Sequence, residues 1–190
     1  MKHLSTALAL ALAASTVAAA PVTDVIDPMH TFPSFEADHM GISVWRGKMK
    51  KNSGKLVYDK ASGAGTVEIT TELASIDFGQ DQLNAWARGK DFFDAKKFPR
   101  AVYKGRFDAP VNGVPTQVVG ELTLHGVTRP LTLKINLLKC VPHPMLKRDY
   151  CGADASGSFS REDYGLGVGK EWGFKMDVDL RIQAEAIAEK

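Results

Sequence analysis

The stretch "MDVDLRIQAEA", residues 176–186, alternates apolar and polar side chains without a break. Side chains of a β-strand point alternately to its two faces, whereas the apolar side chains of an amphipathic helix recur every three or four residues. The stretch therefore predicts a long strand with one apolar and one polar face. The apolar row comprises Met176, Val178, Leu180, Ile182 and Ala184, and the polar row comprises Asp177, Asp179, Arg181, Gln183 and Glu185.

A hairpin is predicted upstream, in "GELTLHGVTRPLTLKINL", residues 120–137. The same alternation runs on both sides of "HGVTRP", where Gly126 can adopt a positive φ and Pro130 can stand only where the ladder needs no N–H donor. Each of the two strands thus presents one apolar row. These rows are Val118, Gly120, Leu122 and Leu124 before the turn, and Leu131, Leu133, Ile135 and Leu137 after it.

Weaker strand patterns bring the predicted total to eight strands, with connections short enough for mostly antiparallel neighbours. Only "GQDQLNAWARGKDFFD", residues 79–94, predicts a helix, because Leu83, Trp86 and Ala87 have helical spacing and Gly89 can end it. The weaker strands are expected at residues 35–44, 54–59, 66–73, 101–107 and 156–160.

The polar rows are expected to face water, so the apolar rows must face one another. Antiparallel strands with one apolar face close most simply into a barrel, which also removes exposed strand edges. We therefore expect an all-β fold, an antiparallel eight-stranded barrel with one short helix, and keep a two-sheet sandwich as the alternative. The interior of such a barrel is either filled by its own side chains or wide enough for one slender ligand, and periodicity does not choose between the two.

The N-terminus has the layout of a secretory signal peptide: Lys2, an apolar run over residues 4–12, and small residues leading to "VAAAP". The apolar run is shorter than the roughly 20 residues that a membrane-spanning helix needs. We expect residues 1–19 to be removed, with cleavage after Ala20 as the alternative, and residues 20–190 to form one domain in the periplasm.

The formal net charge of +2 gives no reason to expect nucleic acid as a partner. Cys140 and Cys151 are the two cysteines of the chain, and in an exported protein such a pair is expected to form a disulfide. A zinc site with His143 as a third ligand is the alternative, but the close-spaced cysteine pairs of zinc sites are absent from the sequence. We therefore expect no metal ion.

No motif of a known catalytic site stands out. The sequence has no HExxH and no GxSxG, and "GLGVGKEWG" fails as a phosphate loop because Tyr164 and Glu171 stand where that loop needs Gly and Ser or Thr. His39 shares the parity of Phe35 and is expected to point into the barrel, as a structural residue or as a ligand contact. We expect no catalytic residue, and keep a lipid hydrolase built on Asp27, His30 and His39 as an alternative.

The aromatic residues in and after the predicted helix have two interpretations. Trp86, Phe92, Phe93 and Phe98 either close one end of the barrel as core, or line the entrance of a long apolar cavity. The residues alone leave both open.

Four segments, in order along the chain, resemble the signatures of the YceI-like family. Members of that family are mostly exported bacterial proteins, similar in shape to lipocalins, with an apolar interior that holds an isoprenoid chain or a comparable lipid and no known catalytic apparatus. The segments are "IDPMHTFPSFEADHMGISVWRGKM" at 26–49, "GKDFFDAKKFPRAVYKG" at 89–105, "GELTLHGVTRPLTL" at 120–133 and "SFSREDYGLG" at 158–167.

The resemblance implies that the inward side chains contact a lipid. The candidates are chosen by parity, the alternation of side chains between the two faces of a strand, and a register shift of one residue would turn all side chains of that strand to the other face. At Trp86 and Ala87 the family often has a His-Leu pair, which implies a different lipid head group here. The expected lipid-binding residues are Phe35, His39, Ile42, Trp86, Phe92, Leu122, Leu124, Leu133, Ile135, Val178, Leu180 and Ile182.

The expected function is therefore that of a periplasmic, non-enzymatic protein that carries or sequesters a polyisoprenoid or similar long-chain lipid. That lipid is its expected ligand and partner, with no other cofactor, no nucleic acid and no stable membrane insertion. The oligomeric state is left open, with a homodimer as one option. The alternatives are a hydrolase acting on a lipid and a ligand-free exported interaction module with a solid core.

Overall fold

The computed structural model describes residues 22–189, which form one sheet of 11 strands, one α-helix and short 3-10 turns. The expected signal peptide, residues 1–19, lies outside the described residues. The elements are β1 (Val22–Ile26), β2 (Phe32–His39), β3 (Ser43–Met49), β4 (Asn52–Tyr58), β5 (Gly65–Glu72), β6 (Ile76–Asp77), α1 (Asp81–Arg88), β7 (Arg100–Asp108), β8 (Gln117–Leu124), β9 (Val127–Pro142), β10 (Asp149–Ser160) and β11 (Asp177–Ala188), with 3-10 turns at Leu73–Ser75, Arg161–Tyr164 and Lys170–Trp172.

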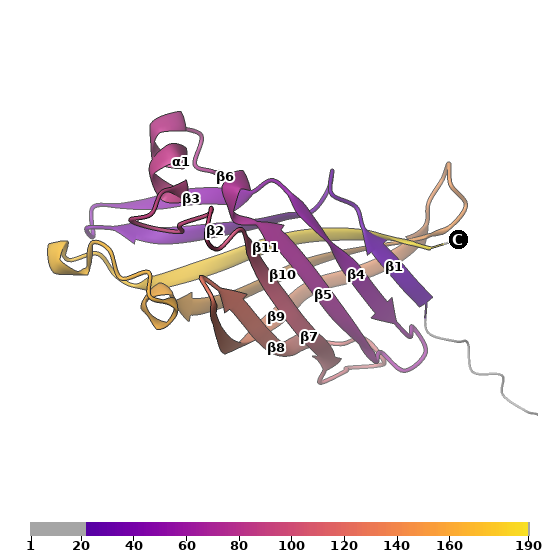
Figure 1. The fold of residues 1–190 in the computed structure, drawn as a ribbon. Coiled ribbons are helices and arrows are strands. Elements are labelled where there is room, and N and C mark those ends of the chain that lie inside the picture. The colour runs from indigo at the N-terminus through magenta and orange to yellow at the C-terminus, as the bar shows by residue number, and fades with distance from the viewer. Residues whose placement is uncertain (1–21, 190) are drawn as a thin grey trace, which may run out of the picture.

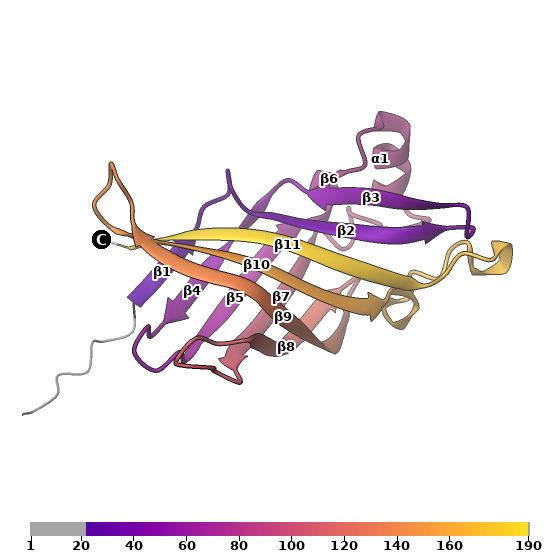
Figure 2. The ribbon, with the colours of Figure 1, turned by 180° about the vertical axis from the view of Figure 1, so that it is seen from behind.

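Eight of the strands close into an antiparallel barrel (Figures 1 and 2). Their order around the ring is β1-β4-β5-β7-β8-β9-β10-β11, and the pairing of β11 with β1 closes it, with Asp24 opposite Ala188 and Ile26 opposite Ala186. The predicted fold class, an eight-stranded antiparallel barrel with one short helix, is confirmed. The sandwich alternative is not what the chain adopts.

The strands of the ring are not all the ones that the sequence predicts. The predicted strand over residues 35–44 is a hairpin, β2 and β3, with a turn at residues 40–42 where Met40 and Gly41 have φ values of 55° and 72°. The ring contains β1, which was not predicted, in place of β2. Strand β10 begins at Asp149 and not near Ser156, because residues 149–156 pair with residues 134–142 of β9.

Strand β11 changes neighbours along its length. Its C-terminal part pairs with β1, and residues 178–183 pair with β2. Between the two, the buried Thr31 hydroxyl accepts from the Glu185 N–H at 3.0 Å and donates to the Glu185 carbonyl at 3.1 Å, so β11 keeps its backbone partners across the change. Asn52 fixes this point by donating to the Thr31 carbonyl at 2.9 Å.

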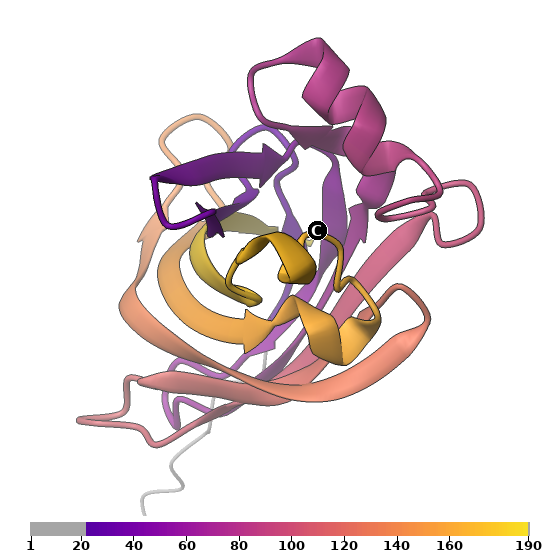
Figure 3. The same cartoon turned by 90° about the vertical axis from the view of Figure 1, so that its left-hand side faces the viewer.

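Strands β2, β3 and β6 extend the sheet beyond the ring at one end of the barrel, with Met49 of β3 opposite Ile76 of β6. Helix α1 packs next to β6, and residues 161–176 lie across the same end, as the view along the barrel in Figure 3 shows. We call this the helix end. The opposite end, where Cys140 and Cys151 lie and where both described chain ends emerge, is the disulfide end (Figure 1).

Helix α1 forms where its spacing predicts. The Gln80 side chain accepts from the Leu83 N–H at 2.7 Å, and the Gly89 N–H closes the last turn on the Trp86 carbonyl. Ala87 is fully buried, while Trp86 is 40% exposed. Within residues 22–189, the structure has no helix that is long and apolar enough to cross a membrane.

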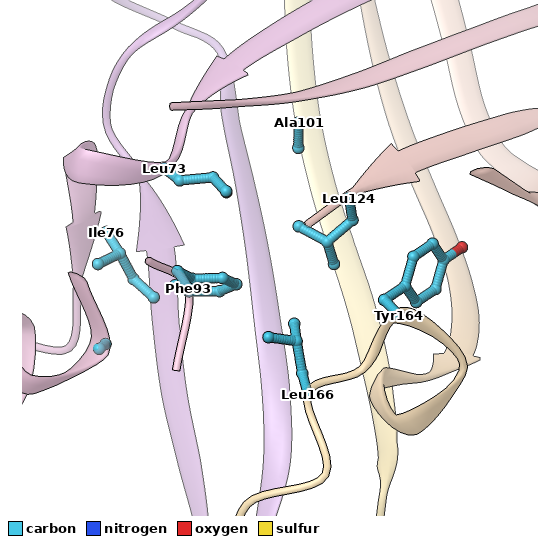
Figure 4. Packing of buried hydrophobic residues seen from close by; sticks show 8 residues of the cluster. Leu73, Ile76, Phe93, Ala101, Leu124, Tyr164 and Leu166 are labelled. Carbon is cyan, nitrogen blue, oxygen red and sulfur yellow. The ribbon is translucent and has the colours of Figure 1, made fainter. Parts of the chain in front are cut away.

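The helix end is held by one buried apolar cluster, in which side chains from α1, the following loop, β7, β8 and residues 161–166 point toward one another (Figure 4). Phe93 belongs to this cluster, and Phe92 packs against it. Both aromatic rings also form part of the cavity wall described below. The two interpretations left open for them, packing in the core and lining a cavity, therefore both apply. The buried members are Leu73, Ile76, Ala87, Phe93, Ala101, Leu124, Tyr164 and Leu166.

Cys140 and Cys151 form the predicted disulfide. They stand directly opposite each other on β9 and β10, with their Cα atoms 4.0 Å apart, and Cys151 is buried. Because the two sulfur atoms are bonded to each other, they are not available as the zinc ligands of the alternative interpretation. His143 lies in the loop between the two strands, where its Nδ1 accepts from the Met145 N–H at 3.2 Å.

Candidate binding cavity

The barrel encloses a cavity of about 480 Å³, within the range of roughly 300–1,000 Å³ that is usual for ligand pockets. Its wall is almost entirely apolar and draws on every strand of the ring. The inner row of β11 runs along it from Val178 through Leu180 and Ile182 to Ala186. At about 3.4 Å per residue, the stretch from Val178 to Ala186 is roughly 27 Å long. The cavity is therefore a long slot and suits a chain-like molecule.

Small side chains keep the slot open from its middle toward the disulfide end. Ala153 and Ala155 of β10 and Ala184 and Ala186 of β11 lie on the wall there. Larger side chains at these positions would fill the interior of a barrel with eight strands. The interior is therefore open because two neighbouring strands carry alanine at their inward positions.

Most of the residues expected to bind lipid lie on this wall. Parity placed those on β8, β9 and β11 correctly. It is wrong for Leu137 of the same apolar row, which is 60% exposed, because the register of β9 against β10 shifts between Ile135 and Leu137 and brings Leu138 onto the wall instead. Contact with a lipid stays a prediction. The residues on the wall are Phe35, Trp86, Phe92, Leu122, Leu124, Leu133, Ile135, Val178, Leu180 and Ile182.

Ile42 and His39 do not lie on the wall. Ile42 is 77% exposed in the turn between β2 and β3, so its expected inward orientation is wrong, and the reason is that no continuous strand runs through residues 40–42. His39 has the inner parity but is the last residue of β2, beyond the cavity, where its ring stacks on Trp45 at 4.2 Å. Trp45, from the unpredicted strand β3, lies on the wall instead.

Tyr103 is a wall residue that the sequence reasoning missed. Its hydroxyl is 3.1 Å from the backbone carbonyl oxygens of both Val118 and Leu131, within hydrogen-bonding distance of each. Burial raises the pKa of Tyr103, so the hydroxyl stays protonated and remains a donor. The parity of the predicted strand 101–107 was the signal that could have found it, since Tyr103 shares a face with Ala101.

A hydrogen-bonded group of polar side chains lies toward the disulfide end. The Tyr150 hydroxyl donates to Glu185, a wall residue, at 2.6 Å and lies 2.9 Å from Asp27. Asp27 in turn pairs with His30 at 2.8 Å. Desolvation, together with the two carboxylates, raises the pKa of Tyr150, which therefore stays neutral.

His30 and Asp27 shift each other's ionisation. The hydrogen bond with Asp27 raises the pKa of His30. Partial burial opposes ionisation of Asp27, but hydrogen bonds from His30, the Met29 N–H and Tyr150 outweigh it and lower its pKa. The pair is exposed on the surface and lies outside the cavity.

The residues of the alternative hydrolase site are not brought together. Asp27 and His30 precede β2, and His39 ends it, so an eight-residue strand separates them. Such a strand is about 25 Å long. Among the residues from 22 to 189, no group of three or more His, Cys, Asp and Glu side chains is arranged to hold a metal ion.

The model of the YceI-like domain matches residues 25–186. The chain belongs to the YceI-like family. A UPF0312 protein of Photorhabdus laumondii is 32% identical over 188 residues, which cover 97% of this chain and 95% of that protein.

Solved structures of other bacterial proteins have a similar fold. The crystal structure of BcnA from Burkholderia cenocepacia has a TM-score of 0.69 at 24% identity, covering 85% of this chain and 99% of that one. A polyisoprenoid binding domain from Saccharophagus degradans has a TM-score of 0.64 at 18% identity, covering 89% of this chain and 99% of that one. At sequence identities below 25%, these structural matches support the barrel fold alone.

Proposed function

We propose that this protein is an exported, periplasmic binding protein that carries or sequesters a polyisoprenoid or a similar long-chain lipid in its barrel. The observation that carries the proposal is the continuous apolar cavity of about 480 Å³. A barrel that served only as a rigid interaction module would have no need of an empty interior. The solid core expected for that alternative is not observed.

The energetics of such a cavity favour long apolar guests. Each methylene group moved from water into an apolar site contributes about 0.8 kcal/mol, so a long chain binds tightly with few polar contacts. The wall along β11, roughly 27 Å long at 3.4 Å per residue, approaches the thickness of about 30 Å of the hydrocarbon core of a bilayer. That core is two acyl chains deep, so the length of the slot favours a chain longer than one ordinary fatty acid.

The relatives support the same ligand class. The Saccharophagus degradans domain with the same fold is a polyisoprenoid binding domain. The disulfide fits an oxidising compartment, as does the signal-like N-terminal sequence. In the periplasm, a water-insoluble lipid needs a shielded environment between two membranes, and the cavity would supply one.

We propose binding without catalysis. Asp27, His30 and His39, the residues of the hydrolase alternative, are separated by a strand. The wall of the cavity is almost wholly apolar, and its buried Tyr103 and Thr71 hydroxyls are engaged with backbone carbonyls and with Asn52. Such a wall holds a guest but offers few groups that could transfer a proton to it.

Native mass spectrometry of protein purified from its own periplasm tests the proposal. We expect a bound mass that organic extraction releases as a polyisoprenoid or another long-chain lipid. The matched control is the same protein after extraction and refolding, which should be empty and should take up the extracted lipid again. Protein that is well folded, empty after gentle isolation and unable to take up long-chain lipids would contradict the proposal.

A further inference from the structure

Arg161 is a charged residue in the wall of an otherwise apolar cavity. The inner row of β10 runs through Ala155, Gly157 and Phe159, and Arg161 continues this row just beyond the end of the strand at the helix end. The side chain is only 7% exposed and lies on the cavity wall. An arginine so placed has given up most of its hydration.

Only some of the hydrogen-bond donors of the Arg161 guanidinium have a partner in the described part of the protein. Its Nη1 donates to the backbone carbonyl of Leu166, and its central carbon lies 5.8 Å from the centre of the Phe92 ring. A guanidinium carries five N–H donors. Among residues 22–189, no carboxylate oxygen lies within 4.0 Å of it, and the neighbouring Glu162 pairs with Lys170 instead. The remaining donors of Arg161 are thus without an anionic partner in the described part of the chain.

The other charged groups of the wall give the cavity two different ends. Glu185 places a carboxylate toward the disulfide end, with Asp27 close behind it through Tyr150. At the helix end the wall also includes Asp38, whose oxygens accept from the Gly41 N–H at 3.1 Å and the Lys175 N–H at 3.2 Å. Asp38 is therefore already held by two N–H donors, whereas Arg161 has one backbone carbonyl and no anionic partner in the described residues. An anion would be repelled at the disulfide end and attracted at the helix end.

We propose that Arg161 anchors an anionic head group, a phosphate or a carboxylate, of a lipid whose apolar chain fills the slot. The inference rests on the proposed function and adds the head-group class and the orientation of the guest. The planar guanidinium binds either oxyanion through paired N–H donors. The Phe92 ring lies beside the site, with its centre 5.8 Å from the guanidinium carbon, and stacks on Trp86 at 5.0 Å.

Paired ligands that differ only in the head group test this inference. The probes are geranylgeranyl monophosphate against geranylgeraniol, and palmitate against hexadecanol, titrated into delipidated protein by intrinsic tryptophan fluorescence. We expect the wild-type protein to bind at least one anion ten times or more tightly than the matching alcohol. The two pairs show whether phosphate or carboxylate is the preferred oxyanion.

The variant Arg161→Met should abolish this preference, so that each anion binds no more tightly than its matching alcohol. Arg129→Met is the matched control, because it removes the same charge from an exposed position near the same end of the barrel and should keep the preference. Arg161→Lys keeps the charge but loses the planar fork, so it should retain part of the preference. It also serves as the second variant if Arg161→Met does not fold.

The outcomes separate this inference from the proposed function. Equal affinity of the wild-type protein for anion and alcohol in both pairs would overturn the role of Arg161 while leaving lipid binding intact. A preference that persists in Arg161→Met would overturn it too. Failure of the wild-type protein to bind any of the four probes would count against the proposed function itself, and the inference would fall with it.

Discussion

Ala155 shows how one small side chain keeps the cavity open. It is buried on the wall and stands opposite Ile182 in the register of β10 and β11. We expect Ala155→Trp to fill the middle of the slot and to lower the affinity for a long-chain lipid at least tenfold, because the indole occupies the space that the guest needs.

Lipid titration of the folded Ala155→Trp variant measures this effect. Ser158→Trp is the matched control, since Ser158 lies on the outer face of the same strand and is exposed. Unchanged lipid affinity in Ala155→Trp, with circular dichroism like that of the wild-type protein, would show that the guest does not lie in the slot.

At the scale of the residue, parity was a good predictor where a strand is regular and a poor one in turns and at the bulge beside Leu137. Leu133 and Ile182 lie in the middle of strands and face inward as expected. His39 has the right parity but lies at the end of its strand, and Ile42 lies in a turn that the alternation does not reveal. Arg161 was missed because it follows the strand, although the inner row of β10 leads directly to it.

At the scale of the element, the connection between β1 and β2 carries a pH-dependent contact, the hydrogen bond between His30 and Asp27. The raised pKa of His30 means that its contribution to stability is present below the ordinary value of 6.5 and is lost as the pH rises through the folded-state pKa. The lowered pKa of Asp27 means that its contribution is present above 3.8 and is lost as the pH falls through the folded-state pKa. The pair therefore stabilises the fold most between these two values.

Urea unfolding of the wild-type protein and His30→Gln at pH 5.5 and pH 9 measures this contact. We expect the wild-type protein to be the more stable at pH 5.5 and the difference to shrink at pH 9. In the background of Asp27→Asn, which removes the carboxylate, His30→Gln should have no pH-dependent effect. An equal gap at both pH values in the native background would contradict the assignment.

The disulfide between β9 and β10 is a second element-scale feature with a measurable effect. It closes a loop with a sequence separation of 11. In the chain-entropy model a closure of this size stabilises the fold by about 2–3 kcal/mol. We expect reduction of Cys140–Cys151 to lower the free energy of unfolding by that amount, measured by urea unfolding with and without reductant.

The double variant Cys140→Ser with Cys151→Ala is the control for the disulfide experiment. It should have the stability of the reduced protein and should not respond to reductant. If reduction leaves the urea midpoint of the wild-type protein unchanged, the cross-link contributes nothing to stability.

The elements themselves were predictable in proportion to their length. Strands with several alternations, such as β8, β9 and β11, were found. Strand β6 has two residues, and β1 has five with a buried Asp24 in its inner row, so neither gives a clear apolar alternation. The turn between β2 and β3 depends on Met40 and Gly41 at positive φ, and an apolar residue such as Met gives no signal for it.

At the scale of the whole molecule, occupancy of the cavity should stabilise the barrel. A ligand that binds only the folded state adds about 2.7 kcal/mol at a free concentration of 100 times its dissociation constant. We therefore expect delipidated protein to unfold at a lower temperature than protein loaded with a long-chain lipid, with the gap growing with lipid concentration.

Differential scanning calorimetry of empty and loaded protein measures this gap. A short alcohol such as butanol, which cannot fill the slot, is the matched control and should leave the unfolding temperature unchanged at the same molar excess. A long-chain lipid that binds but does not raise the unfolding temperature would indicate that it attaches outside the fold or to unfolded chains.

The hollow of the barrel could not be read from the alternation, because a filled and an empty interior place apolar residues at the same positions. It depends on alanines that stand opposite each other on β10 and β11, such as Ala153 and Ala184, and the register of the two strands is known only from the structure. The closed barrel was predicted, but the pair of strands that closes it was not, since β11 pairs with the unpredicted strand β1 across nearly the whole chain.

The change of neighbours along β11 divides the strand into two parts, each held by backbone hydrogen bonds to a different strand. Residues 178–183 are bonded to β2, and the pairs from Ala186 to Ala188 are bonded to β1, so separating β2 from the strand breaks none of the bonds that close the ring. Amide hydrogens in the two halves should accordingly exchange with deuterium at two different rates. The amides of residues 178–183, which pair with β2, can exchange faster while the pairing of β11 with β1 stays intact.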